Sequence, residues 1–156
     1  MNETFYGLAK NWLRNDQLYK FYITKEAILG IKIGGQFFDK VSVRVQLWWL
    51  YLTLIGIPLV EVIAYRAENR RLKLEKEAEN DLRLAGQSDD SLVIHLSDIT
   101  NVTLTHRRDW WTMWINSGAI RFKCLNQANL EFVLTGRQDH EKIAKLLIQQ
   151  GITVEQ

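Results

Sequence analysis

The residues of this 156-residue chain that most often carry chemistry are three histidines and one cysteine. His95, His106 and His140 stand apart, and none has a second histidine or a cysteine at the spacing of a metal site. Cys124 lies in an alternating apolar pattern, and nothing local to it would generate a reactive thiolate, which indicates a buried structural thiol. The spacing therefore predicts no bound metal and no cofactor.

The glycine and serine motifs of common enzymes are missing from the sequence as well. Gly34 and Gly35 are adjacent, but they lack the G-x-G-x-x-G and G-x-x-x-x-G-K-[ST] frames and so predict a turn. The sequence also has no G-x-S-x-G motif and no paired carboxylates in a recognisable catalytic context. We therefore expect a protein that is not an enzyme.

The sharpest candidate for a ligand site is the run HRRDWW at residues 106–111. Arg107 and Arg108 are adjacent planar donors suited to phosphate or carboxylate, and a tryptophan beside them can lie at the level of lipid headgroups. The other interpretation is a hairpin corner whose tryptophans fill the core, and we favour it. Strand alternation places Trp110 and Trp114 on one side and leaves Trp111 on the other. If the corner binds a ligand, we expect an anion held by Arg107, Arg108 and Trp111.

The overall composition is that of a globular protein. Hydrophobic residues make up 47% of the chain and charged residues 24%, which argues against disorder. The net charge of +2 is too small to predict nucleic acid as a partner. A single cysteine excludes a disulfide within the chain and fits a reducing compartment, so we expect a cytoplasmic protein. No signal peptide is recognisable at residues 1–16.

The most apolar segment is LWWLYLTLIGIPLV, residues 47–60, in which Thr53 is the only polar side chain. Such a segment must be hidden from water by protein or by lipid. A helix over residues 47–65 would just span a bilayer at about 1.5 Å per residue. Gly56 and Pro58 interrupt it, however, and Glu61 lies within it.

The strands expected before and after this segment argue further against a membrane span. If they complete one sheet, they must lie on the same side of a bilayer, and one crossing would separate them. Two crossings do not fit, because a turn near Gly56 leaves arms of under ten residues each. We therefore favour burial on protein, then contact with one leaflet of a membrane, and a true span last.

The remaining pattern predicts a mixture of helices and strands. Residues 4–14 have helical spacing, residues 61–84 form a charged helix with a thin apolar stripe, and residues 138–150 form a closing helix. Strands are expected at residues 18–24, 27–33, 91–96, 102–105, 110–115, 119–125 and 130–135. The order indicates an α+β fold with an antiparallel sheet in one domain, residues 1–156, carrying an inserted apolar and helical arm at residues 43–90.

Three phrases carry a resemblance to a known family: YITKEAILGIKIGG at residues 22–35, SLVIHLSDITNVTL at residues 91–104 and HEKIAKLLIQQG at residues 140–151. Together they resemble the bacterial pleckstrin-homology-like domains. The resemblance implies a small bent antiparallel sheet closed at one end by the C-terminal helix. It leaves out residues 1–14 and the arm, and it supplies no catalytic residue.

We therefore expect a non-enzymatic domain that self-associates through the arm, because a second copy is the most common cover for a self-complementary apolar patch. The expected interface residues are Trp48, Trp49, Leu50, Leu54, Ile57 and Val60. The alternative is a peripheral module on the cytoplasmic face of a membrane, with the arm as its anchor and the Arg107–Arg108 corner for anionic headgroups. A homo-oligomer and a membrane surface are thus the two expected partners.

Overall fold

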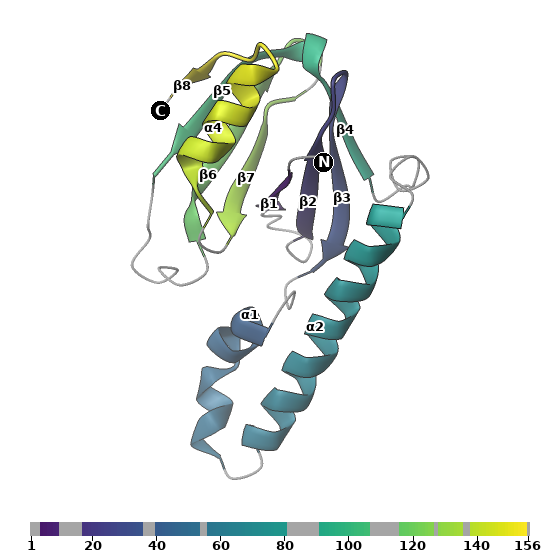
Figure 1. The fold of residues 1–156 in the computed structure, drawn as a ribbon. Helices are drawn as coiled ribbons and strands as arrows, with labels where there is room; N and C mark the ends of the chain where they lie inside the picture. The colour runs from purple at the N-terminus through teal and green to yellow at the C-terminus, as the bar shows by residue number, and fades with distance from the viewer. Residues whose placement is uncertain are drawn as a thin grey trace.

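The computed structural model describes residues 4–9, 17–35, 40–53, 56–80, 91–106, 116–126, 128–135 and 138–155. These described residues form an α+β structure with one eight-stranded sheet and a long helix (Figure 1). The strands are β1 Thr4–Ala9, β2 Gln17–Ile23, β3 Ala27–Gly34, β4 Ser91–His95, β5 Ile99–Thr105, β6 Asn116–Cys124, β7 Leu130–Thr135 and β8 Val154–Glu155. The helices are α1 Lys40–Gln46, the 3-10 helix η1 Trp48–Leu52, α2 Gly56–Asn80, the 3-10 helix η2 Leu96–Asp98 and α4 His140–Gln149.

The strand order in the sheet is β4-β3-β2-β1-β7-β6-β5-β8. Every neighbouring pair is antiparallel except the last, in which β8 runs parallel to β5 through Val102 and Val154. The expectation of a purely antiparallel sheet was therefore wrong at one edge. Between β7 and β8 the chain forms helix α4, and a helical crossover of this kind allows β8 to join the sheet as a parallel strand.

The first element is a strand, and the helix expected over residues 4–14 was wrong for its described part. β1 pairs with β2 along its whole length, from Thr4 opposite Tyr22 to Ala9 opposite Gln17. Gly7 allows β1 to lie close to β7, because a Cβ at this position would lie only 2.9 Å from the Cβ of Phe132. The helical spacing of Phe5 and Leu8 was a local signal, and strand pairing on both sides overrode it.

The main core lies on one face of the sheet, beneath α4. Phe21 is fully buried, and its ring centroid lies 4.8 Å from those of both Phe5 and Phe132. The inward residues of α4 join the same cluster as Phe122 and Phe132, so the helix packs on the sheet as expected of a closing helix. These inward residues are Ile143, Leu146 and Leu147.

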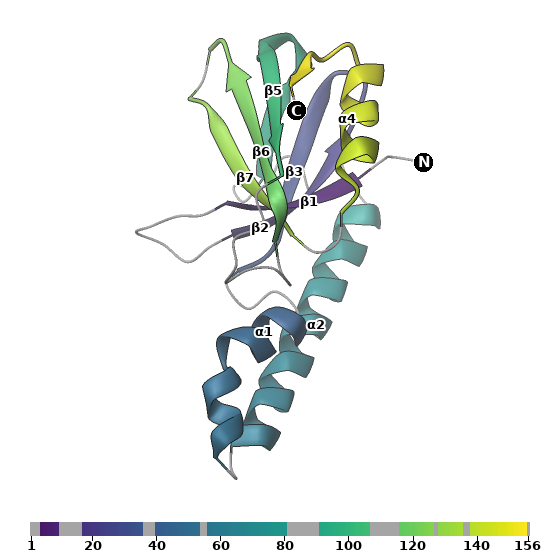
Figure 2. The ribbon, with the colours of Figure 1, turned by 90° about the vertical axis from the view of Figure 1, so that its left-hand side faces the viewer.

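The ends of α4 follow the local signals of the sequence. Asp139 caps its first turn by accepting hydrogen bonds from the backbone N–H groups of Glu141 and Lys142. Gly151 ends the helix with a φ of 81°, a backbone conformation that favours glycine. The helix therefore closes the sheet close to where the sequence placed it, over the strands β5 to β7 (Figures 1 and 2).

Residues 116–118, which lie between two of the expected strands, instead begin strand β6. The register against β7 shifts between Asn116 and Gly118, and Gly118 has a φ of 142°. A Cβ at Gly118 would overlap the carbonyl oxygen of Thr105. The glycine thus allows an irregular start to β6, where a larger residue would collide with β5.

Candidate functional site

The helical arm is a hairpin of α1, η1 and α2 that extends away from one end of the sheet (Figures 1 and 2). Its bend is held by Thr53, whose side chain donates to the carbonyl oxygen of Leu50 and accepts from the N–H of Gly56. Only glycine fits at position 56, because a Cβ would overlap that same carbonyl group. Pro58 follows in the first turn of α2, where its missing N–H costs little.

The apolar stretch is therefore divided between the 3-10 helix η1 and the start of α2. Among the described residues, no helix is both long enough and apolar enough to cross a membrane. α2 is longer than expected at its start, since it begins at Gly56 rather than near Glu61. The proline that seemed to interrupt a helix instead lies in its first turn.

The two helical limbs of the arm enclose a small core of their own. Val43, Val60 and Ala64 are fully buried there, and Leu50 packs against them. Val60 and Leu50 therefore stabilise the hairpin itself. The expectation that Val60 is an interface residue is wrong for this arrangement, because α1 already covers its side chain.

Other apolar side chains of the arm remain exposed. Trp48, Trp49 and Ile57, three of the expected interface residues, are 63%, 55% and 49% exposed. Leu54 lies outside the described residues. Four further apolar residues on α2, which were not among the expected interface residues, are exposed: Leu59, Val62, Tyr65 and Leu72. Their signal was a second stripe at helical spacing, which the charged residues around it had obscured.

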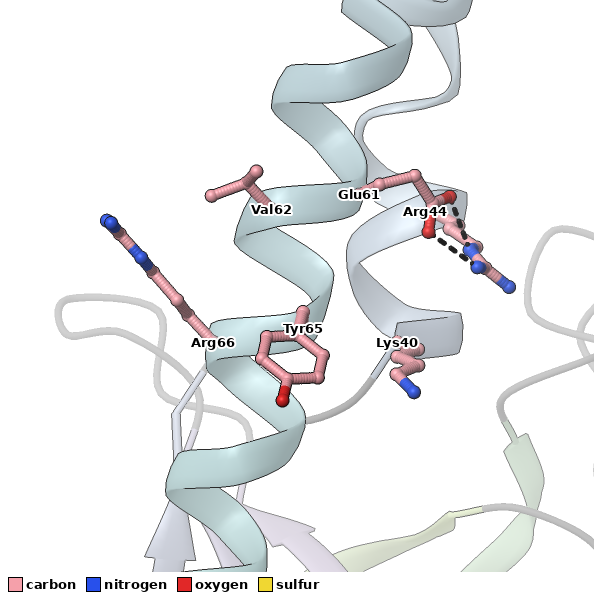
Figure 3. Close-up of a pocket in the computed structure, with 6 residues that line it drawn as sticks. All are labelled: Lys40, Arg44, Glu61, Val62, Tyr65 and Arg66. Carbon is pink, nitrogen blue, oxygen red and sulfur yellow. Dashed lines mark hydrogen bonds and ion pairs between the residues drawn. The ribbon is translucent and has the colours of Figure 1, made fainter.

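A shallow groove of about 390 Å³ lies between the two limbs (Figure 3). The guanidinium of Arg44 on α1 donates two hydrogen bonds to the carboxylate of Glu61 on α2, at 3.0 and 2.7 Å. The ammonium of Lys40 lies 5.9 Å from the ring centroid of Tyr65. Val62 and Arg66 point away from α1 (Figure 3). The ion pair of Arg44 and Glu61 therefore bridges the groove at the surface, and the side chains of Val62 and Arg66 are exposed to solvent.

The second half of α2 packs on the sheet face opposite α4. Leu74 contacts the cluster of Leu18 and Ile33, and Ala78 contacts that of Tyr22 and Ile31. Strand alternation explains the division, since neighbouring residues of β2 point to opposite faces. The apolar stripe that the sequence placed on this helix is thus confirmed at Leu74 and Ala78.

A buried lysine fastens α2 to the sheet. The Lys20 side chain is 7% exposed, and its ammonium donates to the carboxylate of Glu79 at 2.7 Å. A carboxylate oxygen of Glu75 lies 4.0 Å from the same ammonium. The ring centroids of Tyr6 and Tyr22 lie 5.7 and 5.4 Å from it. This anchor was not predicted from the sequence, although a lone charge inside LYKFYI was the available signal.

The environment changes the acidity of this cluster. Burial acts to lower the pKa of Lys20, but the hydrogen bond with Glu79 and the charges of Tyr6, Tyr22 and Glu75 outweigh it and raise that pKa above its ordinary 10.5. Burial also raises the pKa of Tyr22. Because the folded pKa of Lys20 is the higher one, its contribution to stability is complete below pH 10.5 and is lost as the pH rises through the folded value.

The remaining candidate residues fall into two groups. Arg107, Arg108 and Trp111 lie outside the described residues, so the corner stays a prediction. His106 and His140 are far apart in sequence, yet their rings stack with centroids 4.0 Å apart. Within the described part of the chain, no three His, Cys, Asp or Glu side chains gather as they would to hold a metal ion.

Comparison of the chain with protein-family models, with curated proteins and with solved structures found no match. The helical arm, with its exposed apolar side chains, is therefore the candidate functional site on the strength of its geometry alone.

Proposed function

We propose that this chain is a non-enzymatic interaction domain that self-associates through its helical arm. The proposal rests on the distribution of exposed apolar side chains, which gather on the arm. Of the nine large hydrophobic residues that are exposed among the described ones, seven lie on the arm, and only Leu125 and Ile148 lie elsewhere. Exposed apolar side chains that gather on one element mark a contact site, and a second copy is their most common cover.

The mass of the purified chain without detergent tests this proposal. We expect light scattering to give about twice the 18.3 kDa of one chain at micromolar concentration. Replacing Tyr65 with lysine should shift the mass toward that of one chain, because it places a charge within the exposed apolar surface. A wild-type mass of 18.3 kDa across the micromolar range would contradict self-association.

A membrane surface is the second candidate partner, because the free end of the arm has a composition typical of interfacial segments. Trp48 and Trp49 lie in η1, with Ile57 and Leu59 nearby at the start of α2, and all four are exposed. Tryptophan prefers the headgroup region of a bilayer, so this end of the arm could lie at that depth.

Flotation with anionic vesicles tests this second candidate. The wild type should float with the vesicles, and the Trp48→Ala/Trp49→Ala variant should remain at the bottom of the gradient. The matched control is Leu125→Ala, which removes an exposed apolar side chain from the sheet instead. Equal flotation of all three proteins, or of none, would eliminate the arm as an anchor. Adding the Arg107→Ala/Arg108→Ala variant would show whether the predicted corner contributes to binding.

We further propose that the fold is of the pleckstrin-homology-like kind and that the protein is cytoplasmic. The resemblance of residues 22–35, 91–104 and 140–151 supports the first proposal, as does the α4 helix over the strands that precede it. The single cysteine supports the second. The arm would then be an addition to a common scaffold, with function located on the addition.

A further inference from the structure

The outer side of α2 is exposed along its length in the part of the chain that the structure describes. Its inner residues contact α1 in the first half and the sheet in the second, and both lie on the same side of the helix (Figure 1). On the opposite side a row of residues repeats at alternating intervals of four and three: Pro58, Val62, Tyr65, Asn69 and Leu72. All five are exposed. A repeat of this kind presents one continuous stripe, which we call the outer seam, to a neighbouring helix.

The residue types in the outer seam match a two-stranded coiled coil. In heptad terms Val62 and Asn69 occupy the a positions, and Tyr65 and Leu72 occupy the d positions. A β-branched residue at a with leucine at d favours two parallel strands. A single asparagine at an a position specifies register and number of strands at some cost in stability. Lys76 takes the next a position, so the seam ends at Leu72.

The charges beside the outer seam select a direction. Arg66 and Lys73 line one edge, and Glu61 and Glu68 line the other, where Arg44 binds Glu61 and Arg71 binds Glu68 within the chain. In a parallel pair each basic edge lies against the glutamate edge of the other chain, where these ion pairs leave no excess of positive charge. An antiparallel pair would instead place the two basic edges against each other, which is unfavourable. The basic edge therefore favours a second copy in the parallel orientation.

We propose that two copies of this chain pair their α2 helices in parallel and in register along Val62, Tyr65, Asn69 and Leu72. This inference rests on the proposed self-association and names its geometry. The two sheets then lie at the same end of the helix pair, and the two free arm ends lie together at the other. Because the seam covers only about two heptads, the dimer should dissociate on dilution.

Single cysteines introduced into a Cys124→Ser background test the geometry. Val62→Cys and Leu72→Cys should each form a disulfide with the same residue of the partner subunit, since both positions face the two-fold axis. The positions are ten residues apart, about 15 Å along the helix. The control is Arg70→Cys, exposed on the same helix but away from the outer seam, which should not cross-link at the same rate.

Each outcome of the cross-linking experiment decides between arrangements. A dimeric mass with self-linkage at both seam positions supports the inference. A dimeric mass with linkage only in mixtures of the two variants indicates an antiparallel pair and overturns it, while self-association stands. A dimeric mass without linkage, or linkage of the control at the same rate, places the interface elsewhere and also overturns it. A monomeric mass contradicts self-association as well.

The polar position provides an independent measurement. Asn69→Val should tighten association by about tenfold or more and allow assemblies larger than two chains, because the asparagine no longer limits register. Arg70→Val, at the adjacent exposed position, should leave the mass and the dissociation constant unchanged. Equal behaviour of the two variants would overturn the role of the outer seam.

Discussion

Replacing Leu147 with alanine is expected to lower the free energy of unfolding by about 2–5 kcal/mol. The side chain is fully buried in the cluster that joins α4 to the sheet. Its removal would leave a cavity among Phe122, Phe132 and Ile143, which close packing prevents from collapsing completely. Urea denaturation followed by circular dichroism measures the change.

The neighbouring residue supplies the control for this prediction. Ile148 is on the same helix but 57% exposed, so Ile148→Ala should change stability by no more than about 0.5 kcal/mol. A loss of less than that amount for Leu147→Ala would mean that α4 does not close the core. A comparable loss for both variants would indicate weakening of the helix itself rather than of its packing.

Reversing the charge of Lys20 is expected to cost about 3 kcal/mol, at the low end of the cost of an unpaired buried charge. A glutamate there would lie close to Glu75 and Glu79 in a site from which water is largely excluded. The cost stays at the low end because the Glu79 side chain is 58% exposed and can turn toward solvent. The same urea titration measures it.

Two further variants separate the ion pair from general effects of charge. Lys20→Glu combined with Glu79→Lys should recover part of the lost stability, since the pair is restored in the opposite sense. Lys123→Glu, on an exposed strand position, should change stability by no more than about 0.5 kcal/mol. If the double variant is no more stable than Lys20→Glu alone, the anchor does not act through this ion pair.

Several elements of the fold follow from the sequence because their signals are local. The β2–β3 hairpin lies close to its expected position, with Lys25 and Glu26 at its turn and Ile31 and Ile33 on one face. Helix α4 carries its own cap at Asp139 and its own stop at Gly151. In each case a short periodic pattern and its end signals lie within a few residues of one another, so they need no distant partner.

Other features depend on contacts that the sequence does not show. Residues 4–9 have helical spacing, and only pairing with β2 and β7 makes them a strand. Lys20 became an anchor because α2 brings Glu79 to it from 59 residues away in sequence. The parallel pairing of β8 likewise depends on the position of β5 across the sheet.

The candidate site shows the same division most clearly. An apolar, helical arm between the strands could be predicted from the residues alone, because composition and period are local properties. Which side of the first half of α2 is covered stayed undecided, since Val60 and Val62 are equally apolar and both belong to helical stripes. Packing against α1 and the sheet buries Val60 completely and leaves Val62 49% exposed. Only the tertiary structure could make that choice, because the partners of the inner stripe lie on other elements of the chain.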